Sequence, residues 1–179
     1  MIKELQTIFA GFGGQGILFA GKVMAYCGLL EGRQLSWLPS YGPEMRGCTA
    51  NCSVCLSEEA IGSPLVVHPD ALVVMNRPSL EKFENSVVPG GVIILDSTMV
   101  DASVTRTDVT VYRVPASELA DQQGLRGLAN MILLGALYKV RQFCSLEHLE
   151  EGLKKCIPAR KAHLAEGNAK ALKLGYSLV

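Results

Sequence analysis

The feature that most constrains this chain is a glycine cluster that directly follows a short apolar run. Residues 5–11, Leu-Gln-Thr-Ile-Phe-Ala-Gly, have the length and composition of a buried strand. The glycines of residues 11–16, Gly-Phe-Gly-Gly-Gln-Gly, fit the pattern G-x-G-x-x-G. Residues from about 14 to 30 are predicted to be a helix, because Ile17, Gly21, Met24 and Gly28 fall on one stripe at helical spacing, and its two glycines would let the helix lie close to a sheet. A strand, a glycine turn and a helix in this order predict an α/β fold, with a ligand-facing turn at the end of the strand.

Strand and helix patterns alternate along the rest of the chain. This alternation predicts an α/β, Rossmann-like open and mostly parallel sheet in three layers, with helices on both faces, in one domain that spans residues 1–179. Residues 49–56 follow the preceding strand too closely for a helical crossover, so we expect a hairpin or an edge excursion there. The predicted strands are 5–11, 34–38, 49–56, 70–76, 91–96 and 109–114, and the predicted helices are 14–30, 78–83, 116–122, 128–143, 146–156 and 158–174.

The glycine cluster is the first candidate site. Gly11, Gly13, Gly14 and Gly16 permit a tight turn in which backbone amides approach a ligand, and the following helix N-terminus carries about half a positive charge. Together with Gln15, these residues predict a site for an anion such as phosphate or pyrophosphate. The alternative is that the glycines only permit close packing of strand and helix. A dinucleotide is disfavoured, because no acid follows the second predicted strand to hold a ribose.

The loop of residues 39–47, Pro-Ser-Tyr-Gly-Pro-Glu-Met-Arg-Gly, is the second candidate site. It leaves the carboxyl end of a strand, which is the edge where open α/β sheets bind ligands. Ser40, Tyr41, Glu44 and Arg46 bring hydroxyls, a carboxylate and a guanidinium together within seven residues, and Arg46 can grip a phosphate through two hydrogen bonds. The alternative is a solvated turn with an internal pair between Glu44 and Arg46.

Two asparagines complete the candidate residues. Asn76 and Arg77 follow the fourth predicted strand and are expected at the same edge, although residues 78–79 also simply start a helix. Asn130 lies in an otherwise apolar helix, and a buried amide needs hydrogen-bond partners. We therefore expect Asn130 to tie its helix to a neighbouring backbone.

Composition excludes several classes of function. The 179 residues carry 17 basic and 17 acidic side chains, which argues against nucleic-acid binding. No apolar run reaches the ~18 residues of a membrane span, and the first residues do not resemble a signal peptide, so a cytoplasmic protein is expected. Cys52 and Cys55 are expected on opposite faces of a strand, which disfavours a shared metal. No acid, base or nucleophile in a catalytic arrangement is evident.

Taken together, the two loops resemble one protein family. Residues 11–17, Gly-Phe-Gly-Gly-Gln-Gly-Ile, and residues 40–47, Ser-Tyr-Gly-Pro-Glu-Met-Arg-Gly, are similar to the gamma subunit or gamma domain of 2-oxoacid:ferredoxin oxidoreductases. Residues 49–52, 61–64 and 75–79 and Asn130 follow in that family's order, so the resemblance covers nearly the whole chain. One departure is Cys48, where the family commonly has glycine.

The resemblance implies a subunit that is inactive alone. These enzymes convert a 2-oxoacid and coenzyme A to acyl-CoA, CO2 and reduced ferredoxin. Thiamine diphosphate and [4Fe-4S] clusters belong to partner subunits, and the gamma unit is expected to help bind coenzyme A and to assemble with alpha, beta and ferredoxin-like delta subunits. The loop is most similar to enzymes for branched-chain 2-oxoacids such as 2-oxoisovalerate, and the 2-oxoglutarate type is next; the related indolepyruvate type usually has a different loop. The alternatives are a purely structural assembly module and an independent NAD(P)-binding oxidoreductase.

Overall fold

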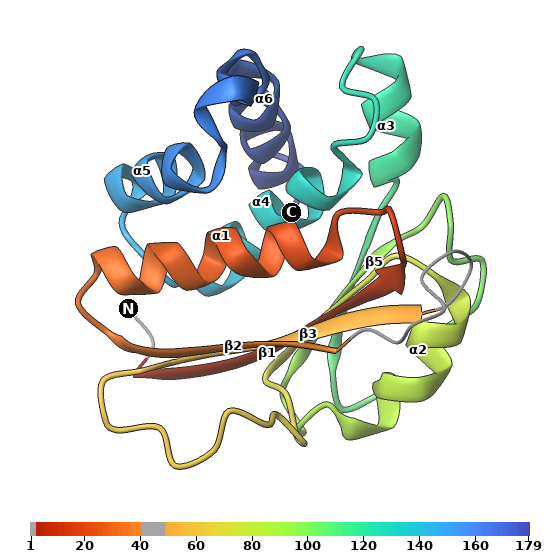
Figure 1. Cartoon of the computed structure of the whole chain (residues 1–179). Helices are drawn as coiled ribbons and strands as arrows, with labels where there is room; N and C mark the ends of the chain where they lie inside the picture. The colour runs from red at the N-terminus through yellow and green to blue at the C-terminus, as the bar shows by residue number, and fades with distance from the viewer. Residues whose placement is uncertain (1–2, 41–48) are drawn as a thin grey trace.

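The computed structural model describes residues 3–40 and 49–179, which form a six-stranded sheet in the order β2-β3-β1-β4-β5-β6. Strand β1 lies inside this sheet, which helices cover on both faces (Figure 1). The strands are β1 (Glu4–Phe12), β2 (Gln34–Ser40), β3 (Thr49–Ser57), β4 (Ala71–Val74), β5 (Val92–Asp96) and β6 (Thr110–Val114). Each lies where its apolar pattern predicts a strand.

Within the described sheet, only β3 runs against the direction of the other strands. Strands β1, β4, β5 and β6 are mutually parallel, whereas β3 is antiparallel both to β1 and to β2. Strand β2 therefore points the same way as β1, and the expected hairpin at residues 49–56 is confirmed. Because β3 is inserted between them, β1 and β2 are two strand spacings apart, about 10 Å rather than the ~4.8 Å of direct neighbours.

Most helices gather on one face of the sheet. Helices α1 (Ile17–Leu30) and α4 (Ala129–Arg141) pack directly on the strands, and α5 (Leu146–Cys156) and α6 (Ala165–Tyr176) lie outside them (Figure 1). Helix α3 (Ala116–Gln122) packs against α4. The larger apolar core lies between these helices and the sheet.

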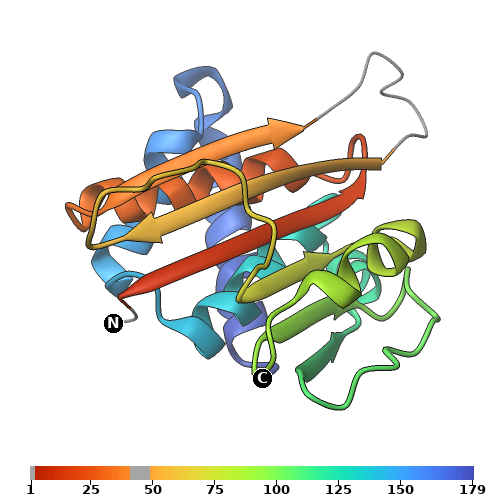
Figure 2. The same ribbon diagram turned by 90° about the horizontal axis from the view of Figure 1, so that it is seen from below.

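The opposite face has a thinner cover. Helix α2 (Arg77–Phe83) packs on β1 and β4 and leads into the 3-10 turn η1 (Glu84–Ser86). In Figure 2 the segment 58–70 crosses this face over β1, β2 and β3. A smaller core, which includes Ile8, Leu72 and Leu80, fills the space beneath them. The predicted three-layer α/β fold is thus confirmed, with an unequal division of helices between the faces.

Glycine residues set the closeness of α1 to the sheet. A Cβ atom on Gly21 would lie 2.4 Å from Cys52 Sγ, and one on Gly28 would lie 2.4 Å from Leu56 Cδ2. Real Cβ atoms do not approach other atoms so closely, so larger residues would push the helix away. The glycine stripe predicted for this helix therefore serves packing at these two positions.

The largest differences from the predicted helix boundaries occur in three helices. Helix α1 begins at Ile17 and not at 14, because Gly14 and Gly16 have positive φ angles of 98° and 76°. Helix α4 ends at Arg141 because Gln142 is left-handed, with φ of 41°. The predicted helix 158–174 is divided into a 3-10 segment, η2 (Ala159–Leu164), and α6, with a non-helical residue at Lys161.

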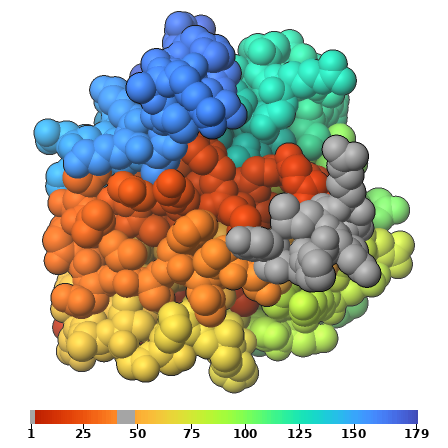
Figure 3. All heavy atoms as spheres, in the orientation of Figure 1, coloured from red at the N-terminus to blue at the C-terminus, as the bar shows by residue number. Residues whose placement is uncertain are grey.

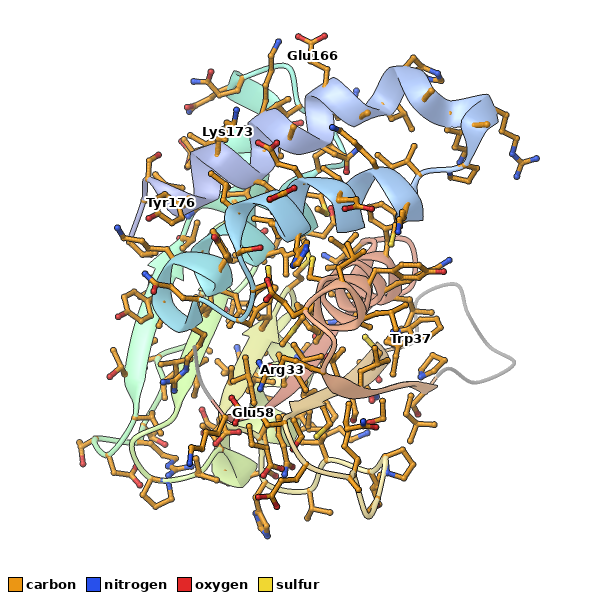
Figure 4. The ribbon with its side chains drawn as sticks, turned by 90° about the vertical axis from the view of Figure 1, so that its left-hand side faces the viewer. Arg33, Trp37, Glu58, Glu166, Lys173 and Tyr176 are labelled. Carbon is orange, nitrogen blue, oxygen red and sulfur yellow. The ribbon has the colours of Figure 1, made fainter. Side chains whose placement is uncertain are left out.

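Arg33 connects three chain segments at the end of the sheet opposite the glycine turn. Its guanidinium donates to the carbonyl oxygens of Lys3 at 2.7 Å, Leu56 at 3.3 Å and Phe143 at 3.5 Å. Figure 4 shows Arg33 beneath α1, near the ends of the strands. One side chain thereby joins the residue before β1, strand β3 and the segment before α5. No helix among the described residues has the length and apolar character needed to cross a membrane.

Candidate functional site

The carboxyl ends of the strands bring the two predicted loops to one edge of the sheet. Phe12, the last residue of β1, is paired with Thr49, and Ser40, the last residue of β2, is paired with Asn51. The chain therefore leaves for residues 41–48, and returns from them, beside the glycine turn. Ser40 is exposed at this edge. The other candidates of this loop, Tyr41, Glu44 and Arg46, lie outside the described residues.

The glycine turn presents an uncapped helix N-terminus at this edge. Gly13 and Gly14 are exposed, and the Gln15 amide donates to the Phe12 carbonyl oxygen at 3.2 Å to close the turn. Gly16 is the N-cap of α1 in a left-handed conformation, and no side chain caps the helix. The first amides of a helix lack partners inside it and carry its positive dipole charge, so an acceptor from outside is favoured here.

Gln15 holds the turn against the neighbouring strand. Its Oε1 atom accepts from the Phe12 amide at 2.6 Å, and its Nε2 atom donates to the Met75 carbonyl oxygen at 3.1 Å. A Cβ atom on Gly11 would lie 2.6 Å from the same Oε1 atom. Gln15 thus bridges the ends of β1 and β4, at the point where the following helices α1 and α2 go to opposite faces. Its side chain shapes the site by positioning the turn.

Asn130 supports the turn from behind. It is 4% exposed, and its Nδ2 atom donates to the Gly16 carbonyl oxygen at 3.0 Å. A Cβ atom on Gly16 would lie 2.5 Å from this Nδ2 atom, so glycine is required by contact as well as by its φ angle. The Asn130 Oδ1 atom is buried and has no partner within the described part of the chain. The expected tie between this helix and a neighbouring backbone is confirmed.

Asn76 has a capping role in the structure. It is 1% exposed, and its Oδ1 atom accepts from the Ser79 amide at 2.8 Å at the start of α2. Its Nδ2 atom and the Ser79 hydroxyl are buried without a partner among the described residues. Asn76 therefore lies at the predicted edge, but the capping bond turns its carbonyl oxygen toward α2. A contact between Asn76 and a ligand stays a prediction.

A small notch of about 230 Å³ opens beside the glycine turn. In Figure 3 the red atoms of the N-terminal residues meet the teal atoms of the α3 and α4 region on this side of the molecule. The notch is smaller than the roughly 300–1,000 Å³ of a pocket that encloses a whole small molecule. It is lined by Gly14, Gln15, Met75, Ser117, Ala120, Asp121, Gly127 and Ala129.

Sequence reasoning missed the part of this lining that comes from α3 and the start of α4. Ser117 is placed by the buried carboxylate of Asp96, which accepts from its hydroxyl at 2.5 Å and its amide at 3.3 Å. Asp121 lies one turn further along α3. No motif marks these residues, and only the sheet order brings them to the glycine turn. The signal that could have found them is the predicted helix 116–122, which directly follows the last strand and therefore begins at the carboxyl edge of the sheet.

The notch has a mixed electrostatic character. No lysine or arginine is among its described lining residues, and Asp121 adds a carboxylate to its rim. A positive contribution comes from the α1 N-terminus, roughly half an elementary charge, and the first turns of α3 and α4 also line the notch. An anion is therefore favoured on the α1 side of the notch, and a nearby cation would strengthen its binding. Arg46 is the candidate for this cation, on the segment that joins Ser40 to Thr49.

Cys52 and Cys55 lie on opposite faces of β3. Cys52 Sγ lies 3.7 Å from the Ile17 carbonyl oxygen on the α1 side, and Cys55 is on the other face of β3, as expected. Burial raises the pKa of the Cys52 thiol to about 12, only partly offset by a hydrogen bond with Trp37, so it is a protonated thiol at neutral pH. Across residues 3–40 and 49–179, no three His, Cys, Asp or Glu side chains are grouped to hold a metal ion.

Comparison with known proteins identifies the family. The family model for pyruvate ferredoxin/flavodoxin oxidoreductase matches residues 6–178. A 2-oxoglutarate synthase subunit KorC from Methanocaldococcus jannaschii is 32% identical over 181 residues, which cover 99% of this chain and 94% of that one. A ketoisovalerate oxidoreductase subunit VorA from Methanothermobacter thermautotrophicus is 46% identical over 134 residues, 75% of this chain but 28% of that protein. This chain thus spans about a quarter of the VorA relatives.

Solved structures agree with this relationship. The keto/oxoacid ferredoxin oxidoreductase gamma subunit from Geobacter sulfurreducens superposes with a TM-score of 0.82 at 27% identity, covering 97% of this chain and 96% of that one. A 2-oxoglutarate:ferredoxin oxidoreductase from Magnetococcus marinus shares the fold with a TM-score of 0.88 at 24% identity, over 99% of this chain and 31% of that one. The chain therefore belongs to the pyruvate ferredoxin/flavodoxin oxidoreductase family, and its fold matches that of a gamma subunit.

Proposed function

We propose that this chain is the gamma subunit of a 2-oxoacid:ferredoxin oxidoreductase and that its glycine turn receives the phosphate end of coenzyme A. The complete enzyme would convert a 2-oxoacid and coenzyme A to acyl-CoA, CO2 and reduced ferredoxin. The carrying observation is the uncapped N-terminus of α1, which opens at the carboxyl edge beside a notch too small for a whole cofactor. Coenzyme A carries phosphates that suit this positive end. The structure from Magnetococcus marinus contains coenzyme A, which makes this ligand the natural candidate.

The proposed site is completed by other polypeptides. A notch of about 230 Å³ holds a phosphate group with its neighbouring atoms and leaves the rest of coenzyme A outside. Arg46 would add a bidentate guanidinium from the adjoining segment, with Ser40, Tyr41 and Glu44 beside it. Thiamine diphosphate and [4Fe-4S] clusters would belong to the alpha, beta and delta-type partners. The substrate is proposed to be 2-oxoisovalerate or 2-oxoglutarate, the acids named for the VorA and KorC relatives.

An NAD(P)-binding enzyme fits the geometry poorly. A dinucleotide-binding fold uses an acid at the end of the strand next to β1 to hold the ribose. Here the neighbour of β1 on that side is β3, which runs in the opposite direction, and β2 ends at Ser40 about 10 Å away. No acidic side chain therefore stands where the ribose hydroxyls would lie in the described structure.

A structural assembly module is the second candidate function, and a specific observation favours it. Several glycines have a packing role, because a Cβ atom on Gly11, Gly16, Gly21 or Gly28 would strike a neighbour at 2.4–2.6 Å. Gly14 is different, since nothing lies within 4 Å of its Cβ position. Packing therefore does not explain the open part of the turn, and this part carries the ligand-binding proposal.

Steady-state kinetics of the assembled oxidoreductase separate the two candidates. Arg46→Ala is expected to raise the KM for coenzyme A at least tenfold, with a smaller change in kcat, because it removes a contact made in the bound state. Arg160→Ala, an exposed arginine of η2, is the matched control. An unchanged KM in an intact complex would support the structural module. Calorimetry with NAD and coenzyme A tests the alternative of an independent NAD(P)-binding enzyme, which tight NAD binding without a response to coenzyme A would favour.

A further inference from the structure

A second and larger hollow lies between the two outer helices, far from the glycine turn along the chain. Its volume is about 600 Å³, and it shares no lining residue with the notch. Figure 4 shows one of its walls, where Lys173 and Tyr176 project from α6 above α5. We call it the α5–α6 groove; it is lined by Tyr138, Leu146, Leu149, Glu150, Leu153, Lys154, Ala165, Glu166, Ala169, Leu172, Lys173 and Tyr176.

The groove exists because each outer helix is fastened to a different inner helix. Helix α5 packs on α1 through Gly152, where a Cβ atom would lie 2.8 Å from Cys27 Sγ. Helix α6 packs on α4 through Gly135 and Gly175, whose Cβ atoms would lie 2.1 Å and 1.8 Å from backbone oxygens of the facing helix. These backbone approaches fix the two outer helices in place. Few side chains are left to fill the space between them.

The lining of the groove is apolar at its base and small on one wall. Leu149, Leu153 and Leu172 are each buried to 6% exposure or less and form the base. Ala165 and Ala169 lie one helical turn apart on α6, and their short side chains leave space on that side of the groove. At the open end Leu146 is 59% exposed and Tyr176 is 39% exposed. A hollow of this volume lined mainly by hydrophobic side chains is the usual form of a binding site in a folded protein.

Charged groups surround this apolar base. Glu150, Lys154 and Lys173 line the groove, are exposed, and make no ion pair within the described part of the chain. Charges of both signs at the rim, around an apolar centre, have the composition of a protein–protein interface. Unpaired rim charges steer a partner of complementary charge and set its register. A small apolar ligand would make no use of them.

We propose that the α5–α6 groove receives an amphipathic helix from another subunit of the oxidoreductase. The occupying helix has apolar residues at i, i+3 or i+4 and i+7, acidic side chains toward Lys154 and Lys173, and a basic side chain toward Glu150. Helix α5 has 11 residues, about 16 Å, which matches roughly three turns of such a helix. A dry cavity of ~150 Å³ accepts one benzene-sized group, so about 600 Å³ accommodates about four apolar side chains.

The choice of a partner subunit rests on the family and on the chain lengths of its relatives. This chain corresponds to 28% of the VorA relative and to 31% of the Magnetococcus marinus chain, so in those proteins the domain is joined to much more polypeptide. Surfaces of the domain therefore have large neighbouring domains available to cover them. The proposal is independent of coenzyme A binding, because groove and notch have no residue in common.

Association measurements on the oxidoreductase test this proposal. Ala169→Trp places an indole in the open groove, and Lys170→Trp places the same group on the exposed side of α6 as its control. Leu146→Lys has Glu147→Lys as a matched control on α5. Each variant chain is added to the other subunits, purified without this chain. Ala169→Trp and Leu146→Lys are expected to raise the dissociation constant at least tenfold, and the two controls to change it less than threefold.

Equal affinity of the Ala169→Trp and Lys170→Trp chains would overturn the proposal. A dimer of the isolated wild-type chain in sedimentation, dissociated by Leu146→Lys, would also overturn it, since the occupant would then be a second copy. If Ala169→Trp does not fold, hydrogen exchange of the wild-type chain decides. Slower exchange in 146–156 and 165–176 on assembly supports the proposal, and unchanged exchange refutes it. Arg46→Ala should leave assembly intact, which separates this result from a failure of coenzyme A binding.

Discussion

Replacing Gly16 by alanine tests the physical link between the glycine turn and the helix behind it. Gly16 has a φ angle of 76°, a left-handed conformation that costs an alanine about 1–2 kcal/mol. Its new Cβ atom would also lie 2.5 Å from Asn130 Nδ2 and 2.9 Å from Asn130 Cγ. The Asn130 side chain must then move away from the Gly16 carbonyl oxygen, which it contacts at 3.0 Å.

The expected loss of stability is the sum of these two effects. A buried hydrogen bond contributes about 1 kcal/mol net, and it is lost in addition to the backbone strain. Gly16→Ala should therefore lower the free energy of unfolding by about 2–3 kcal/mol. Gly32→Ala is the matched control, since Gly32 has φ of 71° and nothing within 4 Å of its Cβ position. It should lose only about 1–2 kcal/mol, from backbone strain alone.

Urea unfolding of the purified chain measures the values through a double-mutant cycle. In an Asn130→Ala background the contact and the hydrogen bond are already absent, so Gly16→Ala should cost about 1 kcal/mol less than in the wild-type chain. Distant, independent positions add within roughly 0.3–0.5 kcal/mol. Additive costs within that margin, or equal losses for Gly16→Ala and Gly32→Ala, would refute the proposed coupling between turn and helix.

Two further predictions concern packing and pH. Gly135→Ala places a Cβ atom 2.1 Å from the Leu172 carbonyl oxygen, so it should destabilise the chain by about 3 kcal/mol and lower the Tm by roughly 6–12 °C. Gly62→Ala is the control and should change the Tm little, because nothing lies within 4 Å of its Cβ position. Equal Tm values for the two variants would contradict the close approach of α4 and α6. Burial opposes the charge of Glu31, but hydrogen bonds with Ser145 and His148 outweigh this effect and lower the pKa of the Glu31 carboxyl. The ionised carboxylate therefore stabilises the fold at pH values above the pKa of Glu31 in the unfolded chain. This stabilisation is lost as the pH falls through the lower pKa of the folded chain. The stability difference between the wild-type chain and Glu31→Gln should therefore shrink between about pH 5 and pH 3 in urea titrations, while exposed Glu58→Gln stays near the wild type; a difference that grows on acidification would contradict it.

Most of the fold could be predicted from the sequence, because the patterns that indicate strands, turns and helices are local. Apolar runs of strand length and the turn glycines each act within a few residues, and so does the cap of α5, where Ser145 accepts from the His148 amide. The family resemblance rested on such local motifs as well. Asn130 was expected to bond a neighbouring backbone because a buried amide needs a partner, and its partner is Gly16, 114 residues away.

What the patterns did not predict depends on how distant segments meet. The placement of β3 between β1 and β2 follows from strand order, which no local motif specifies. The same strand order brings Ser117 and Asp121 to the notch, so their position in the site could not be predicted from local patterns. The α5–α6 groove was also unforeseen, because it arises from close glycine contacts of α5 and α6 with different inner helices. Asn76 shows the reverse case, where a plausible ligand contact is also a helix cap.

Electron cryo-microscopy of the complete oxidoreductase with coenzyme A bound would test the central claim most directly. The account predicts phosphate density against the first amides of α1, next to Gly14 and Gly16, with the Arg46 guanidinium on its other side and atoms of a partner subunit around the remainder. Coenzyme A bound wholly within other subunits, with no density at the N-terminus of α1, would contradict it.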